Sequence, residues 1–352
     1  MTTLDKTLRL AAVQAAPVFL DRELSTRKAC ELIREAGRNG ADIVGFPEGF
    51  IPGHPGWQEL IPATSELSLT LGRRLFKNAV EVPGPSVDAL SAACREAGVY
   101  AVVGVNERRA DTTGSLFNTQ LFFGKDGTLL HKHQKIVPTI GERVFHTPGT
   151  TGSKASVKTE IGTISGLLCG ENANPLFQYA VGLDYPVVHV ASWPSHFGPG
   201  LALEGLGMQE TIALITQGCA YALKCFVINS VAAMSDDIIE AYGVDAAASA
   251  FLKERSNHGG TSIIGPGGQI IAGPLPPGEA ILYADVRLDD VIIPKFIHDF
   301  AGHYNRPDLF ASLFNGKTAP APRKEKSEQD MGLATINKEL SELPFAQSTV
   351  PV

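Results

Sequence analysis

Apolar and polar residues follow two patterns along the chain: short apolar runs and longer stretches with helical spacing. Residues 8–14 form a short apolar run, which predicts a buried strand. Ser25 or Thr26 is placed to cap a helix, and Gly40 is placed to end it before a strand at Ile43. The apolar positions of this helix are Ala29, Leu32, Ile33 and Ala36. The N-terminal region is therefore predicted to be a strand–helix–strand unit.

A second unit of the same kind follows, and then the pattern changes to hairpins. Residues 86–97 have helical periodicity, Gly98 ends that helix, and residues 99–105 form the next strand. Glycine-containing turns at 124–127 and 265–268 each separate two short apolar segments, which predicts two hairpins. The flanking segments are 121–123 with 128–131, and 261–264 with 269–272.

Between the hairpins, strands and helices alternate again. The predicted elements are a strand that ends at Cys169, a helix from about Pro175, a strand at 187–191, a helix within 207–223 and a strand at 226–229. Strand–helix–strand units combined with hairpins predict an α/β fold, in which helices cover layered sheets whose strands are not all parallel. The topology is left open by this pattern.

Composition excludes several classes of partner. The 352 residues are 44% hydrophobic, enough for one large core or two modest ones. Lys and Arg number 30 against 37 Asp and Glu, a formal net charge of -7. Because no broad basic field is available, we expect neither nucleic acid nor a membrane as a partner.

The N-terminus and the cysteines predict the compartment. Residues 1–17 carry charges at Asp5, Lys6 and Arg9 among short apolar stretches, which fits neither a secretory signal nor a membrane span. The 5 cysteines are odd in number and scattered, so reduced thiols and a cytoplasmic location are expected.

Cys169 is the candidate nucleophile. It lies where an apolar strand ends and a helix is about to begin at Pro175, with Asn172 or Asn174 as the cap. Backbone N–H groups at a helix start lower the pKa of a thiol and so favour the reactive thiolate. A small buried apolar residue is the commoner role of a cytosolic cysteine. The position between strand and helix favours the nucleophile.

Two charged residues lie at similar positions. Glu48 follows Pro47 at the end of an apolar segment, and Lys135 follows the strand that starts near Leu129. Most charged residues at strand ends are only solvated, so each alone is weak evidence. Together with a thiol they form a reactive set, because a carboxylate can move the thiol proton and a lysine can stabilise negative charge.

The backbone N–H of Gly170 could supply a second donor to the developing charge. This chemistry needs no metal or other cofactor, and none is predicted.

These residues resemble the nitrilases of the carbon–nitrogen hydrolase superfamily. Glu48 in Phe-Pro-Glu, Lys135 in Lys-Ile-Val-Pro-Thr and Cys169 in Cys-Gly-Glu-Asn-Ala-Asn-Pro match the family's catalytic glutamate, lysine and cysteine in chain order. The resemblance extends to residues 303–308, which look like the family's closing motif. It implies a four-layer α-β-β-α sandwich, and it implies that Glu142 is the additional glutamate that helps to position the substrate or the lysine.

The flanking residues resemble the nitrilase branch more than the amidases or carbamoylases. In those branches the cysteine usually precedes Tyr-Asp or Asn-Asp and the lysine lies in a Lys-Ile-His-Leu run, whereas here Gly-Glu-Asn follows Cys169 and Ile-Val-Pro-Thr follows Lys135. Many nitrilases have tryptophan directly after the nucleophile. This chain has Gly170, which leaves space near the thiol, and the substrate class is therefore open.

Two segments are candidates for the substrate pocket. His54 and Trp57 lie in the proline-rich loop after Glu48, although a surface loop with a packed tryptophan is an equal alternative. Trp193, Pro194 and Phe197 end a strand and resemble the second pocket-forming segment of nitrilases, with aromatic groups suited to an apolar substrate.

Other patterns do not predict a site. His131 and His133 share a strand face, but no third metal ligand stands at a recognisable spacing. Glycine-rich runs at 149–154 and 316–318 are interpreted as turns rather than phosphate loops. The chain lacks the G-x-G-x-x-G fingerprint of dehydrogenases and the G-x-S-x-G elbow of serine hydrolases.

The sequence therefore predicts an enzyme that hydrolyses an organic nitrile to the carboxylic acid and ammonia through a cysteine thioimidate. The alternatives are an amidase or carbamoylase on the same scaffold, or a catalytically silent scaffold member. We expect residues 1–315 to form the catalytic domain and the polar, proline-spotted residues 316–352 to form an extended tail. The resemblance also implies a homo-oligomer, a dimer that extends to a spiral or filament.

Overall fold

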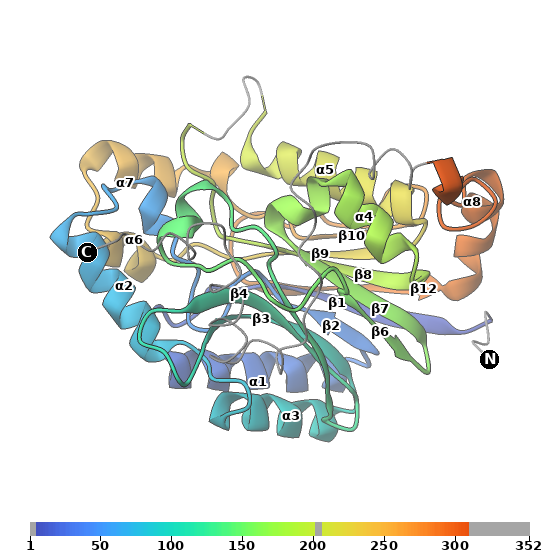
Figure 1. The fold of residues 1–352 in the computed structure, drawn as a ribbon, viewed down its shortest axis with the longest axis horizontal. Helices are drawn as coiled ribbons and strands as arrows, with labels where there is room; N and C mark the ends of the chain where they lie inside the picture. Colours follow the sequence, from blue (N-terminus) through green and yellow to red (C-terminus); the bar gives the residue numbers. More distant parts are fainter. Residues whose placement is uncertain (1–4, 201–205, 310–352) are drawn as a thin grey trace, which may run out of the picture.

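Two six-stranded sheets packed face to face form the centre of the computed structural model, which describes residues 5–200 and 206–309 (Figure 1). In order across the first sheet lie β12 (Ala280–Arg287), β1 (Thr7–Gln14), β2 (Ile43–Gly45), β3 (Tyr100–Arg108), β4 (Leu116–Phe123) and β5 (Leu129–Gln134). Across the second lie β11 (Ile270–Ala272), β10 (Ser262–Ile264), β9 (Phe226–Val231), β8 (Pro186–Trp193), β7 (Gly162–Leu168) and β6 (Ser156–Thr159).

Helices cover the outer faces of both sheets (Figure 1). The first sheet is covered by α1 (Arg22–Arg38) and α3 (Pro85–Ala97), and the second by α4 (Pro175–Gly182) and α5 (Met208–Leu223). Near one end of the sheets lie α2 (Glu66–Asn78), α6 (Asp236–Tyr242) and α7 (Ala246–Lys253), and near the other lies α8 (Ile292–Ile297). This arrangement confirms the expected α-β-β-α sandwich.

In the described part of the chain, five short 3-10 helices lie between these elements. They are η1 (Gly56–Glu59), η2 (Ile140–Val144), η3 (Cys169–Ala173), η4 (Arg255–Asn257) and η5 (Leu288–Val291). Two of them, η2 and η3, begin just beyond the ends of β5 and β7. They shape the region of the molecule in which the polar side chains gather.

The alternation of side chains along β1 shows why the layers form. Leu8, Leu10 and Ala12 belong to the hydrophobic cluster between the two sheets. Ala11 and Val13 point the other way and belong to the cluster beneath α1 and α3. Because successive residues of a strand face opposite sides, one apolar run supplies both interfaces, each of which excludes water.

Strand pairing confirms the predicted strand–helix–strand units and hairpins, and it adds the strand β12, which the sequence did not predict. The strands β1, β2 and β3 are parallel, as are β7, β8 and β9, whereas β4 with β5 and β10 with β11 form the two predicted hairpins. The strand β12 pairs antiparallel with β1 from Thr7↔Arg287 to Gln14↔Ala280. It was missed because most of its residues are half-exposed or exposed at a sheet edge and have no clear apolar alternation.

The predicted start of α1 is wrong. Asp21 is the N-cap, and its carboxylate accepts a hydrogen bond from the Leu24 N–H at 2.9 Å. Ser25 and Thr26 lie inside the helix, where their hydroxyls donate to the carbonyls of Val18 and Arg22. A serine or threonine hydroxyl inside a helix can donate a hydrogen bond to a nearby backbone carbonyl, so these two residues are not restricted to capping positions.

Some of the predictions concern residues outside the described part of the chain. The predicted tail at 316–352, and the last residues of the predicted domain, 310–315, fall outside the described residues. Within residues 5–200 and 206–309, every helix is too short or too polar to cross a membrane.

The close approach of the two sheets generates a stability prediction at Gly45. A Cβ atom there would lie 2.7 Å from Ile228 Cγ2 and 2.8 Å from Val190 Cγ1, both in the second sheet. Gly45→Val should therefore destabilise the fold, by roughly 1–3 kcal/mol, because an overpacked core must shift. Urea unfolding followed by circular dichroism measures the change.

The matched control is Gly218→Ala in α5, where an added Cβ meets nothing within 4 Å. Alanine has the higher helix propensity, so this variant should match or exceed the wild-type stability, by up to about 1 kcal/mol. An unchanged unfolding midpoint for Gly45→Val would contradict the packing argument.

Candidate active site

Glu48, Lys135 and Cys169 all lie just beyond strand ends, on loops that follow β2, β5 and β7. The Lys135 ammonium donates to Glu48 Oε1 at 2.8 Å and to Glu142 Oε2 at 2.5 Å. All three of these charged side chains are buried. The structure thus brings the predicted carboxylates and lysine together, although Glu48 and Glu142 lie far apart in the sequence.

The backbone around Glu48 is fixed by both sheets. The Glu48 N–H donates to the Trp193 carbonyl at the end of β8, at 3.2 Å. On the other side, Gly104 of β3 lies so close to Pro47 that a Cβ atom would be 2.1 Å from its carbonyl oxygen. Glycine permits this approach, so the backbone before Glu48 lies directly against β3, and the Glu48 side chain is buried.

Asn118 of β4 holds the two carboxylates in place. Its Nδ2 donates to Glu48 Oε1 at 2.7 Å and to Glu142 Oε1 at 2.8 Å. Glu48 Oε1 therefore accepts from both Lys135 and Asn118, while Glu48 Oε2 has no partner among the described residues. The unengaged oxygen is the one available to accept a proton.

Glu142 is the most heavily bonded of these groups. Besides Lys135 and Asn118, it accepts from the Thr139 N–H at 2.7 Å, and His146 Nδ1 lies at 3.2 Å. Burial by itself would raise the pKa of this carboxyl, but Lys135 and the hydrogen bonds of His146 and His54 hold the pKa well below its usual value. Glu142 is therefore an anion that fixes the lysine.

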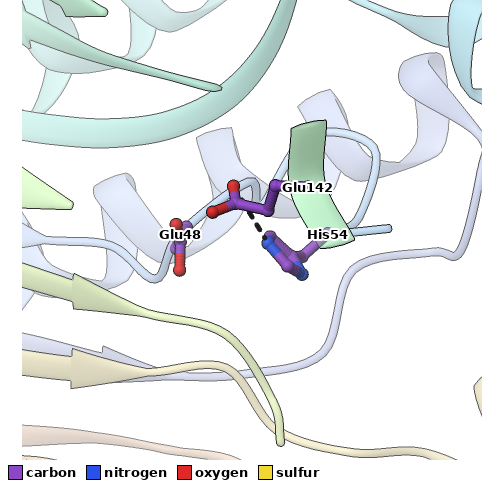
Figure 2. Close-up of side chains that lie close together, drawn as sticks. All are labelled: Glu48, His54 and Glu142. Carbon is purple, nitrogen blue, oxygen red and sulfur yellow. Dashed lines mark ion pairs between the residues drawn. The ribbon is translucent and has the colours of Figure 1, made fainter. Parts of the chain in front are cut away.

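His54 extends this cluster. Its Nε2 lies 3.5 Å from Glu142 Oε1, and Figure 2 shows the ring directed at Glu142 with Glu48 beside them. Burial would lower the pKa of His54, but the hydrogen bond to Glu142 and the charge of Glu48 raise it above its ordinary value. His54 can thus carry a proton next to the two carboxylates.

The Lys135 ammonium is the cation of this site. Burial would lower its pKa, but the carboxylates of Glu48 and Glu142 raise it well above the usual value, so the group remains charged. Glu48, His54 and Glu142 place ligand atoms within 4.8 Å of one another, a spacing that a metal ion could use. Since the ammonium already bonds both carboxylates, the arrangement supports a lysine-centred site.

The two histidines that the sequence offered as possible metal ligands, His131 and His133, bond to different groups. His131 Nε2 lies 2.9 Å from the Lys154 carbonyl, and His133 Nε2 lies 2.9 Å from Glu171 Oε2. They do not converge on a shared position.

Cys169 occupies a strained backbone position. It is the first residue of η3 and has a φ of 49°, in the left-handed region that non-glycine residues seldom adopt. Such a conformation costs on the order of 1–3 kcal/mol and persists only where the surroundings enforce it. The turn directs the thiol away from the regular path of β7.

The net shift of the Cys169 pKa is opposite to the expected lowering. Burial raises the pKa of Cys169 well above its usual value, and Glu48 adds to this, while Lys135 and the Gly170 N–H act in the opposite direction. As predicted, α4 begins at Pro175 with Asn174 as its N-cap, which accepts from the Leu176 N–H at 2.9 Å, so Cys169 lies before this helix rather than at its N-terminus. Cys169 is therefore a protonated thiol at neutral pH, and a base must remove its proton.

Gly170 leaves open space beside the thiol. The residue is exposed, and an added Cβ would meet only Thr139 Oγ1, at 3.6 Å. A side chain could therefore stand here without a clash, and its absence widens the approach to Cys169.

The predicted pocket residues divide into two groups. Trp193 and Phe197, whose ring centroids are 6.2 Å apart, pack in the same hydrophobic cluster as Cys169, and Pro194 follows directly. Trp57 is fully buried in another cluster, edge-on to Phe145 with centroids 5.3 Å apart. Trp57 is thus a packed tryptophan, as in the alternative interpretation of its loop, and its role in substrate binding stays a prediction.

Several polar residues of the site were missed by the sequence reasoning. Asn118 lies in β4, which has three consecutive polar residues among apolar ones and is buried throughout. Buried polar side chains in such a strand need partners, and this signal could have identified it. Behind Glu142, His146 Nε2 bonds Asn106 Oδ1 at 2.8 Å. Glu171 and His133 form a further buried pair next to Cys169 and Lys135.

The chain is similar to known proteins over most of its length. The chain is 34% identical over 346 residues to "Nitrilase 3" of an unknown prokaryotic organism, covering 97% of this chain and 100% of that protein. It is 36% identical over 332 residues to a nitrilase of Bacillus sp. (strain OxB-1), covering 94% of each.

A solved carbon–nitrogen hydrolase of Helicobacter pylori G27 has a similar fold, with a TM-score of 0.64 at 18% identity, covering 88% of this chain and 99% of that one. The sequence model described as carbon-nitrogen hydrolase matches residues 9–292. The chain therefore belongs to the carbon–nitrogen hydrolase family.

Proposed function

We propose that this protein is a nitrilase that hydrolyses an organic nitrile to the carboxylic acid and ammonia. The observation that carries the proposal is the buried Lys135 ammonium between two carboxylates, in the same charged environment as the thiol of Cys169. The relatives named nitrilase match the chain over more than nine tenths of its length, which supports the nitrile as substrate.

Glu48 is the general base of the first step. Its unengaged Oε2 takes the proton of Cys169, the sulfur attacks the nitrile carbon, and a carbon–sulfur bond forms. One electron pair of the carbon–nitrogen triple bond moves to the nitrogen, which receives the proton from Glu48. The product of this step is a covalent thioimidate.

Two water molecules complete the reaction. Glu48 takes a proton from the first water as the water oxygen adds to the thioimidate carbon, and it passes this proton to the nitrogen. The remaining hydroxyl proton then moves through Glu48 to the same nitrogen, the carbon–nitrogen bond breaks, and ammonia leaves to give a thioester. The second water cleaves the thioester, which releases the carboxylic acid and returns the proton to the thiol. The net reaction consumes a nitrile and two waters and needs no redox partner.

Lys135 and the Gly170 N–H stabilise the charge that develops during these steps. A donor in a buried site acts strongly because water does not screen it, and the site holds it in place before the reaction. Asn118 orients Glu48, and Glu142 holds Lys135, so the reacting groups keep their relative positions. Trp193, Pro194 and Phe197 supply an apolar wall, with His54 on the polar side.

The proposal extends to the cellular location, the assembly and the domain boundary. The scattered cysteines support a reducing, cytoplasmic location, and the family resemblance supports a homo-oligomer. Residues 1–315 are proposed as the catalytic domain, because the family match spans 9–292.

Replacing the lysine should nearly abolish activity. Lys135→Ala removes the donor to the developing charge and leaves two buried carboxylates without their cation, so kcat should fall by about 10²–10³-fold or more. Steady-state ammonia release measures it. The matched control is Lys132→Ala. Lys132 lies in β5, three residues before Lys135, and its ammonium bonds Glu107 at 2.7 Å. A Lys135→Ala protein with most of its nitrile turnover would refute the role.

A substrate panel tests the function itself. Aliphatic, arylacetic and aromatic nitriles, cyanide and the matching amides are incubated with purified protein, and ammonia, acid and amide are quantified separately. We expect faster turnover of nitriles than of amides, and no turnover by Cys169→Ala. Faster release from simple amides would instead establish an amidase.

Thiol labelling addresses the catalytically silent alternative. The other four cysteines are buried, so iodoacetamide should add to Cys169 first under native conditions, as mapped by peptide mass spectrometry. A protein that turns over no nitrile and resists this labelling would be a silent family member.

A further inference from the structure

Glu171 makes contacts that no step of the proposed chemistry uses. Its Oε1 accepts from the Ile136 N–H at 2.8 Å, and its Oε2 accepts from the Leu168 N–H at 3.0 Å. The residue is 3% exposed. A buried carboxylate is costly unless it is fully bonded, so its retention at this position calls for an explanation.

The two N–H groups belong to the neighbours of the reacting residues. Ile136 directly follows Lys135 beyond the first sheet, and Leu168 directly precedes Cys169 at the end of the second sheet. One carboxylate therefore bridges the two backbone segments that carry the ammonium and the thiol. Among residues 5–200 and 206–309, Glu171 is the side chain that accepts from both segments.

His133 completes the bonding of this carboxylate. Its Nε2 lies 2.9 Å from Glu171 Oε2, and its Nδ1 has no partner among the residues described. Because only Nε2 faces an acceptor, the ring donates from that nitrogen. Burial would raise the pKa of Glu171, but His133 and the two N–H groups hold the pKa below its usual value. Glu171 is thus an anion.

The next residue secures the opposite side of the turn. Asn172 Nδ2 donates to the carbonyls of Leu167 and Cys169, at 3.1 and 3.0 Å, and its Oδ1 lies 2.9 Å from His189 Nε2. Burial lowers the pKa of His189 to about 3, so this ring is neutral and donates from Nε2. The strained turn at Cys169 is therefore held at its N–H side by Glu171 and at its carbonyl side by Asn172.

We propose that Glu171 is a positioning residue that sets the separation of the Cys169 thiol and the Lys135 ammonium by bonding both backbone segments at once. The proposal rests on the proposed function, since it assigns these two groups to one reaction. The role requires a carboxylate. A glutamine has a single acceptor oxygen, and its amide N–H groups would face one of the backbone N–H donors.

Kinetics of Glu171→Gln test the proposal. Misplacing a reacting group by about 1 Å can cost on the order of 10²-fold in rate, so kcat on the best nitrile should fall by about that factor with little change in KM. Glu171→Asp keeps the charge but is one methylene shorter and cannot span both N–H groups, so it should also lose kcat. It serves as the second variant should Glu171→Gln fold poorly.

Glu107→Gln is the matched control for the loss of a buried carboxylate. Glu107 is equally 3% exposed and accepts from the side chains of Lys132, Thr119 and Gln134 on the first sheet. None of these bonds comes from a backbone N–H beside Lys135 or Cys169. The Glu107→Gln variant should lower the unfolding temperature and keep kcat near wild type. If Glu107→Gln and Glu171→Gln lose kcat equally, or if Glu171→Gln keeps kcat within threefold of wild type, the positioning role is wrong.

The rate of Cys169 alkylation by iodoacetamide at fixed pH gives a readout that needs no nitrile. Lys135 lowers the pKa of the thiol, so a looser lysine slows alkylation in Glu171→Gln, whereas mere loss of a nearby negative charge speeds it. Slower alkylation supports the proposal, and equal or faster alkylation overturns it. A wild-type protein that hydrolyses no nitrile refutes the proposed function, and alkylation still decides the role of Glu171.

Discussion

A single ammonium group buried between two carboxylates is the interaction on which the site depends. Lys135 bonds both Glu48 and Glu142 where almost no water reaches. Each charge there is stable only because the opposite charge and the hydrogen bonds of Asn118 are present, since an unpaired buried ion is expensive. The same pairing keeps Lys135 positive and Glu142 negative, so the charges that the reaction needs are built into the fold.

The two-sheet sandwich makes this pairing possible. Apolar side chains fill the space between the sheets along most of its length, and polar side chains gather near the ends of β4, β5, β7 and β8. Loops after the strands of both sheets meet there, which places groups from distant parts of the chain in one low-dielectric region. The rigid sheets fix the loops at both sides, and hydrogen bonds between them limit their movement.

Opposing effects act on the pKa of the Cys169 thiol. Burial and two nearby carboxylates keep the Cys169 thiol protonated, while Lys135 and the Gly170 N–H favour the thiolate. In the mechanism proposed above, the sulfur becomes a strong nucleophile when Glu48 removes its proton beside a substrate. The left-handed backbone at Cys169 adds strain that Glu171 and Asn172 hold in place.

The sequence by itself determined the βαβ units, the hairpins and the positions of Glu48, Lys135 and Cys169 at strand ends. Those features follow from local periodicity and turn residues, which each segment carries in its own composition. Tertiary structure alone decided that Asn118 joins the two carboxylates, that Trp57 packs away from the thiol cluster, and that burial raises the thiol pKa. These depend on which distant segments come together and exclude water, and no local pattern encodes that.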